Sequence, residues 1–164
     1  MFAFSRIAAV LLLPVLAWGG AVSGNSPEPS KPPSLAAPAP VAELKRAANG
    51  GDEAAMCTLG DYYRKGLHVK KNLSQALQWY VQAAKAGSAT GQYRLAQAYH
   101  LGLGTDSNQI SACIWSSLAA EHGTANLQQI TELKEKTCAL LTPEQRERST
   151  VVMELFRKQV SVKR

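Results

Sequence analysis

Three cysteines and three histidines are the residues of this sequence best suited to carry chemistry. They are Cys57, Cys113, Cys138, His68, His100 and His122. The cysteines form no Cys-x-x-Cys pair and the histidines are scattered, so their spacing does not predict a metal site. Catalysis would require a nucleophile or a carboxylate beside one of the histidines, and no motif places one there. We therefore expect neither an enzyme nor a bound metal or cofactor.

What a cysteine can do also depends on its compartment, and the N-terminus indicates export. Arg6 is followed by an apolar run over residues 7–16 and then by small residues, as in a secretory signal peptide. We expect residues 1–23 to be a signal peptide, with cleavage between Gly19 and Gly24, which would make the mature protein periplasmic or secreted. The alternative is an uncleaved membrane anchor with the domain facing the periplasm, but the apolar run is short for a span and contains Pro14.

A proline-rich segment separates this N-terminus from the part of the chain that can fold. Six of the eight prolines lie between Asn25 and Pro40, and such a composition favours an extended tether over a packed core. We therefore expect a linker over residues 24–40 and a folded domain over residues 41–160, which is not expected to insert into a membrane. The formal net charge of +6 comes without a long basic run or interleaved aromatic residues, which argues against nucleic acid as a partner.

The elements that must position the cysteines and histidines follow from an internal repeat. Residues recur at an offset of 36 between Leu59 and Ala125. The first copy contains Leu59, Tyr63, Gly66, Ala76, Trp79, Ala83, Ala84 and Gly87, which return as Leu95, Tyr99, Gly102, Ala112, Trp115, Ala119, Ala120 and Gly123. A period of this length is typical of helical solenoids, in which each repeat is a pair of helices.

Helical spacing predicts where the helices of each repeat lie. Repeat one (about 52–87) has helices over 52–65 and 73–86, and repeat two (about 88–123) has helices over 88–101 and 109–121. A buried stripe is predicted on the second helix of repeat one, made by Ala76, Trp79, Ala83 and Ala84. The tryptophan rings of both repeats should fill the space that the alanines leave open. Gly60 is small where a neighbouring helix must approach, and Gly66 should end the first helix.

Both ends of the repeat region are expected to be covered by helices, because an end repeat has no neighbour to bury its apolar face. A short helix over 41–49 would form the N-terminal cap, and residues 124–160 would form the C-terminal cap. Thr142 followed by Pro143 marks the start of the last helix. Five residues of that helix are expected to point inward: Val151, Val152, Leu155, Phe156 and Val160.

The repeat resembles the Sel-one-like (Sel1-like) repeat family, a 36-residue relative of the tetratricopeptide repeat. The residues that carry the resemblance are Leu59-Gly60, Tyr63, Gly66, Ala76, Trp79-Tyr80, Ala83-Ala84 and Gly87, with their second copies. The sequence departs from the family pattern at His68 (usually Gly), Asn72 and Asn108 (usually Asp) and Ser116 (usually Tyr). The resemblance implies an all-α, right-handed α/α solenoid of two 36-residue helix-turn-helix repeats with helical caps. It further implies a non-catalytic scaffold that binds other proteins.

Export makes a disulfide between Cys113 and Cys138 possible. Cys113 lies in the second helix of repeat two, and Cys138 lies in the helix expected to pack antiparallel to it. They are 10 and 15 residues from the turn at Gly123, so they face each other only if the two helices are staggered. The alternative is that all three cysteines are small buried residues of an apolar face. Cys57 lies on a helix that does not neighbour that of Cys113 and is expected to be isolated.

The first helices line the concave side in tetratricopeptide-like stacks, so their polar residues are the candidates for binding a protein partner. In repeat two these are Tyr93, Gln97 and His100, at the helical spacing i, i+4, i+7. Their counterparts in repeat one are Cys57, Asp61 and Arg64. An ordinary solvated face is the alternative for each of these residues.

The sequence as a whole predicts an exported, non-enzymatic protein–protein interaction scaffold or adaptor of a bacterial envelope. Two other functions agree with the same features. One is a periplasmic immunity protein that inhibits a secreted toxin enzyme, such as a phospholipase. The other is a structural component of an envelope machine such as a flagellar motor. The sequence does not identify the partner in any of the three.

Overall fold

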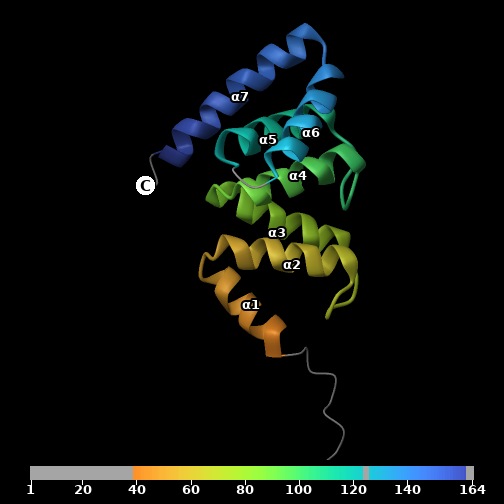
Figure 1. Ribbon diagram of the computed structural model, residues 1–164, viewed down its shortest axis with the longest axis vertical. Helices are drawn as coiled ribbons and strands as arrows, with labels where there is room; N and C mark the ends of the chain where they lie inside the picture. Colours follow the sequence, from red (N-terminus) through yellow and green to blue (C-terminus); the bar gives the residue numbers. More distant parts are fainter. Residues whose placement is uncertain (1–38, 124–125, 162–164) are drawn as a thin grey trace, which may run out of the picture. The chain divides into compact units, whose positions relative to one another are not determined.

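The computed structural model describes residues 39–123 and 126–161, with the side chains of residues 41–123 and 126–159. Every regular element in these ranges is an α-helix (Figure 1). The helices are α1 (Ala39–Asn49), α2 (Glu53–Lys65), α3 (Leu73–Ala86), α4 (Ala89–Leu101), α5 (Gln109–His122), α6 (Leu127–Ala139) and α7 (Pro143–Ser161). The predicted signal peptide and nearly all of the predicted linker lie outside the described residues.

Each helix from α1 to α5 packs against the next one along the chain, and α7 packs on α5 (Figure 1). The first helices of the two repeats, α2 and α4, also contact one another, whereas α3 and α5 make little or no contact. The α2 and α4 side of the stack is therefore the more closely spaced side. This arrangement of adjacent helix pairs confirms the predicted all-helical solenoid.

The boundaries of α2, α3, α4 and α5 follow the predicted ones closely because a capping side chain precedes each of these helices. Asn72 and Asn108 cap α3 and α5, and their side chains accept hydrogen bonds from the amides of Gln75 and Ser111 at 3.0 and 2.9 Å. Asp52 was predicted to be the first helical residue of α2. It is instead the cap, in extended conformation, with its side chain 3.0 Å from the amide of Ala55.

The loop between α2 and α3 has a histidine at the position where the loop of repeat two has a glycine. Gly66 ends α2 in the left-handed conformation, with φ at 76°, as predicted. Two residues later His68 also adopts a left-handed φ of 58°. Its counterpart one repeat later is Gly104, which has a φ of 80°. His68 therefore keeps the backbone path that glycine provides in repeat two, and its ring lies 5.0 Å from that of Tyr62.

Two clusters of buried residues join successive helices between α1 and α4. The first, between α1, α2 and α3, contains Val41, Ala48, Ala55, Met56, Cys57, Leu59 and Ala83. The second, between α2, α3 and α4, contains Tyr63, Ala76, Tyr80, Ala84 and Leu95. The prediction for the tryptophans is right only in part, because Trp79 and Trp115 are half-buried while Tyr80 is 2 % exposed.

Gly60 makes room for the ring of Tyr80. A methyl group on Gly60 would lie 2.6 Å from Cδ1 of Tyr80 and nearer still to Cε1, which is far inside van der Waals contact. In repeat two the equivalent residues are Ala96 and Ser116, so a larger residue on the first helix accompanies a smaller one on the second. Gly60 therefore allows a close approach, as expected, but the group that approaches it is the Tyr80 side chain and not the backbone of a helix.

The last helix, α7, starts as predicted but turns a different side toward the stack. Thr142 and Gln145 cap it reciprocally, through bonds of 3.0 and 3.3 Å between each residue's side chain and the other's amide. Val151, Val152 and Leu155 are 54 %, 47 % and 56 % exposed, so the prediction that they point inward is wrong.

The inward side of α7 is defined by residues spaced i, i+4, i+7. Ser149 is 2 % exposed, and Met153 and Phe156 are half-buried. The small Ser149 lets the helix approach, and the Phe156 ring meets Trp115 of α5 edge-on at 5.1 Å. Apolarity alone does not specify which side of a helix is buried when the stripe that packs contains a serine. The side chain of Val160 lies outside the described residues.

Candidate functional site

Asp61 of α2 is the centre of the polar residues on the closely spaced side of the stack. Its Oδ1 accepts a hydrogen bond of 2.6 Å from the hydroxyl of Tyr80. Its Oδ2 lies 3.2 Å from Nη2 of Arg94 on α4, and Arg64 on its own helix reaches Oδ1 at 3.4 Å. One carboxylate thus connects α2, α3 and α4 and crosses the boundary between the two repeats.

The network continues along α4 to two of the residues predicted for partner binding. Nη1 of Arg94 donates to Oε1 of Gln97 at 3.2 Å, and Nε2 of Gln97 donates to the hydroxyl of Tyr93 at 2.9 Å. The guanidinium of Arg94 lies 6.0 Å from the centre of the Tyr93 ring. We refer to Asp61, Arg64, Tyr93, Arg94 and Gln97 together as the α2–α4 face.

The α2–α4 face has more hydrogen-bond donors than acceptors and a surplus of positive charge. Two guanidinium groups share the single carboxylate of Asp61, and each guanidinium carries five N–H groups. The Nε of Arg94 is buried and has no hydrogen-bond partner among residues 39–123 and 126–161. The side chains of Asp61, Arg64 and Arg94 remain 24 %, 30 % and 29 % exposed, so the face is open to a partner.

The phenol of Tyr80 is held in its neutral form beneath this face. Burial is the main cause, and the hydrogen bond to the Asp61 carboxylate adds to it; both raise the pKa of Tyr80 well above its ordinary range. A neutral hydroxyl always has a proton to donate. Tyr80 therefore fixes the position of the Asp61 carboxylate and, through it, of Arg94.

His100 is the one predicted partner-binding residue that the structure keeps apart from this network. Its Nδ1 lies 2.8 Å from Oε1 of Gln109, and Nε2 of Gln109 donates to the His100 carbonyl at 3.4 Å. Gln109 begins α5, so these bonds join the end of one helix to the start of the next. His100 therefore lies in the last turn of α4, beside the loop that connects α4 to α5.

Arg94 and Tyr80 were not predicted from the sequence to be parts of this network, although the spacing between Asp61 and Arg94 indicates their contact. Arg94 follows Asp61 by 33 residues, which is one repeat less one helical turn. Residues at that offset lie on the same side of the first helices of neighbouring repeats, and their charges are opposite. Tyr80 gave no such signal, because a tyrosine beside Trp79 belongs to the repeat pattern itself.

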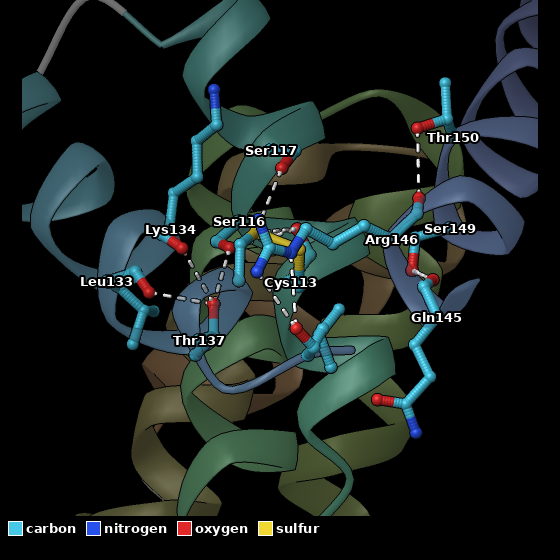
Figure 2. The surroundings of a disulfide bond; sticks show 12 residues. Cys113, Ser116, Ser117, Leu133, Lys134, Thr137, Gln145, Arg146, Ser149 and Thr150 are labelled. Atoms are coloured by element: carbon cyan, nitrogen blue, oxygen red, sulfur yellow. Dashed lines mark hydrogen bonds between the residues drawn. A yellow bond between two sulfur atoms is a disulfide. The ribbon is translucent and has the colours of Figure 1, made fainter. Parts of the chain in front are cut away.

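Cys113 and Cys138 are joined by a disulfide between α5 and α6, with their Cα atoms 4.9 Å apart (Figure 2). Beside it, the buried hydroxyl of Ser116 lies 3.3 Å from that of Thr137 and donates to the Cys113 carbonyl at 3.1 Å. Figure 2 shows these residues gathered around the bridge. The covalent bond thus lies within a small polar contact between the two helices.

Cys57, the free cysteine, is buried in the first core cluster, 3.7 Å from the hydroxyl of Ser88. Burial is the main reason that the pKa of its thiol is raised, so the thiol stays protonated at neutral pH. Among residues 39–123 and 126–161, no three His, Cys, Asp or Glu side chains are placed to share a metal ion. The same ranges contain no helix long and apolar enough to cross a bilayer.

The repeat region is similar to known proteins. The Sel1 repeat matches residues 53–88 and 89–124. A crystal structure of c5321, a protective antigen of uropathogenic Escherichia coli with an SLR fold, is similar over 75 % of this chain, with 27 % identity and a TM-score of 0.66. A Sel1 repeat protein from Oxalobacter formigenes is similar over 58 % of the chain, with 30 % identity and a TM-score of 0.52.

The aligned regions span 26 % and 40 % of those two proteins, which are therefore longer than the part they share with this chain. No curated protein sequence matches the chain significantly. Sel1 repeat proteins generally mediate protein–protein interactions and form a scaffold family that is generally non-enzymatic. The chain therefore contains two Sel1 repeats, at residues 53–88 and 89–124.

Proposed function

We propose that this protein is exported to a bacterial envelope and there binds a protein partner through the α2–α4 face, without chemistry of its own. The observation that carries the proposal is the network that links both repeats through Asp61 and Arg94. It lies on the side that stacks of this kind present to their partners, and it is built from residues that the repeat does not need for packing.

The composition of the α2–α4 face suits a binding surface. Tyrosine and arginine are the side chains most often found at the energetic centre of protein interfaces. Here Tyr93 and Arg94 are held by hydrogen bonds before any partner arrives, so binding would cost little additional side-chain entropy. The surplus of donors favours a partner that offers carboxylates or carbonyl oxygens.

Export is supported by the sequence of residues 1–23 and by the bridge between Cys113 and Cys138, because disulfides persist in oxidising compartments. Intact-mass measurement of the protein isolated from its own cells tests this part. The expected mass is that of a chain whose first residue lies between Gly19 and Gly24. A full-length protein in the cytoplasmic fraction would contradict it.

The binding face is tested by capturing partners from envelope extract with two matched variants. Y93A/Q97A removes two side chains of the α2–α4 face and leaves the pair of Asp61 and Arg94 in place. Q78A/Q82A changes two exposed glutamines on α3 instead. We expect one stoichiometric partner that is lost with the first variant and kept with the second.

Two results would contradict this assignment. A partner that Y93A/Q97A still captures at the same yield would place the binding site elsewhere on the protein. If no protein is captured at any salt concentration, the protein does not act by stable partner binding. Circular dichroism of both variants shows whether the fold is kept.

A further inference from the structure

The outer side of α7 carries apolar residues that the described part of the chain leaves exposed. Among the described helices α7 packs mainly on α5, through the side that carries Ser149 and Phe156 (Figure 1). Val151 and Leu155 lie one helical turn apart on the opposite side, where they are 54 % and 56 % exposed. Val152, 47 % exposed, borders them.

Two pairs of charged residues lie at equal distances before and after Val151. Glu144 precedes Val151 by seven residues and Lys158 follows it by seven. Arg148 precedes Val151 by three and Glu154 follows it by three. All four charged side chains are exposed, and all lie on the outer side of the helix. The face is thus acidic at one end, basic at the other, and opposite in sign at matching distances from Val151.

We propose that α7 pairs with α7 of a second copy of this chain, antiparallel, about a two-fold axis at Val151. Residues equally far before and after Val151 then face one another. Val151 meets its own counterpart, Arg148 of each copy meets Glu154 of the other, and Glu144 of each meets Lys158 of the other. Such self-complementarity is what a two-fold interface requires. Leu155 comes to lie against the methylene groups of Glu147.

Other ways of pairing the same surface bring like charges together. A parallel pair would place each charged residue opposite its own copy. An antiparallel pair shifted so that Val151 meets Leu155 would improve apolar contact but place Arg148 opposite Lys158. Like charges directly opposed destabilise helix pairs, so charge selects the register centred on Val151.

The first test is charge reversal, with the oligomeric state measured by analytical ultracentrifugation over a range of concentrations. R148E and E154R each turn two attractive contacts of the dimer into repulsive ones. We expect either change to raise the dissociation constant about tenfold or more, and R148E/E154R to restore it to within about threefold of the original protein. Both residues are exposed and lie on the side of α7 opposite the α5 contact. Arg148 also forms an ion pair of 2.6 Å with Glu144 of its own helix, but these two side chains are 77 % and 72 % exposed, so losing the pair should change Tm little.

The result that would overturn the proposal is a protein that stays monomeric up to about millimolar concentration, or a double variant no better than the single ones. V151E provides a further check, because it places a charge at the two-fold axis and should abolish the dimer. If V151E dimerises as well as the original protein, the association involves another surface.

The second test is cross-linking, which reports the register directly. V151C should form a disulfide-linked dimer on mild oxidation, because each Val151 faces its own counterpart. L155C is the matched control, since Leu155 has nearly the same exposure but would lie about 12 Å along the helix from its counterpart. Linkage through position 155 and not 151 would overturn the proposed register.

Discussion

Replacing Gly60 by alanine tests whether the fit between Gly60 and Tyr80 is what orders this part of the stack. Alanine should favour helix α2 by about 1 kcal/mol because glycine is a poor helix former. Against this, its methyl group would lie 2.6 Å or less from two atoms of the Tyr80 ring. Overpacking of that kind costs about 1–3 kcal/mol. The ring is 2 % exposed and its hydroxyl is held by Asp61, so it has little room to move.

Because the ring cannot move aside, we take the upper end of that range, about 3 kcal/mol. After the helix gain of about 1 kcal/mol, we expect G60A to lower the free energy of unfolding by about 2 kcal/mol, measured by urea denaturation. The sign should reverse when the ring is absent. Y80S copies the serine that stands at the same place in repeat two, and in that background G60A should stabilise the protein by about 1 kcal/mol. The coupling between the two positions would then be about 3 kcal/mol.

Two further variants test the same reasoning if Y80S destabilises the protein too much for its unfolding to be measured. A96G, at the equivalent position of repeat two, should destabilise by about 1 kcal/mol or more, because no ring there requires a glycine. G91A is the matched control: its methyl group would meet the backbone of Ala83 at 2.9 Å and should be as costly with Tyr80 as without it. Equal cost of G60A in both Tyr80 backgrounds would refute the reasoning.

Three other predictions follow from contacts described above. Reducing the bridge between Cys113 and Cys138, or replacing both residues by serine, should lower the free energy of unfolding by about 3 kcal/mol, because the bridge closes a loop of 25 residues; thermal melts with and without reductant measure this. The hydrogen bond from Arg157 lowers the pKa of Glu121, so this pair should stabilise the fold above the ordinary carboxyl pKa of 4.5 and lose that effect as the pH falls below it. E121Q should therefore show a shallower loss of stability in acid, seen by denaturation at pH 7 and pH 3.5. D61A should cost about 2–4 kcal/mol, since it leaves the neighbouring donors unpaired, whereas an unchanged urea midpoint would show that the network does not stabilise the fold.

The repeat made most of the fold predictable. The four helices of the two repeats could be placed within one residue at each end because identical residue types recur at a fixed offset, and because Asn and Gly mark many of the helix ends. The predicted residues Asp61, Arg64, Tyr93 and Gln97 do lie together, since helical spacing and the period place them on one side. These features depend only on local geometry repeated along the chain.

Contacts between particular side chains were less predictable. Arg94 joins the face because its long side chain reaches across the repeat boundary, which a comparison of equivalent positions does not show. The orientation of α7 depends on Ser149 fitting against α5, and serine carries no apolar signal. His68 could be recognised as a departure from the pattern, but only the structure shows that it takes the backbone conformation of a glycine.

The bridge between α5 and α6 also determines how the C-terminal part of the domain responds to a pulling force. A force applied between α1 and the end of α7 passes directly from Cys113 to Cys138, so the residues between them carry no tension. The fully stretched chain is then shorter by the length of that loop, about 85 Å for 25 residues. Chemical reduction would release this length, and the same protein would act as a shorter tether in an oxidising compartment than in a reducing one.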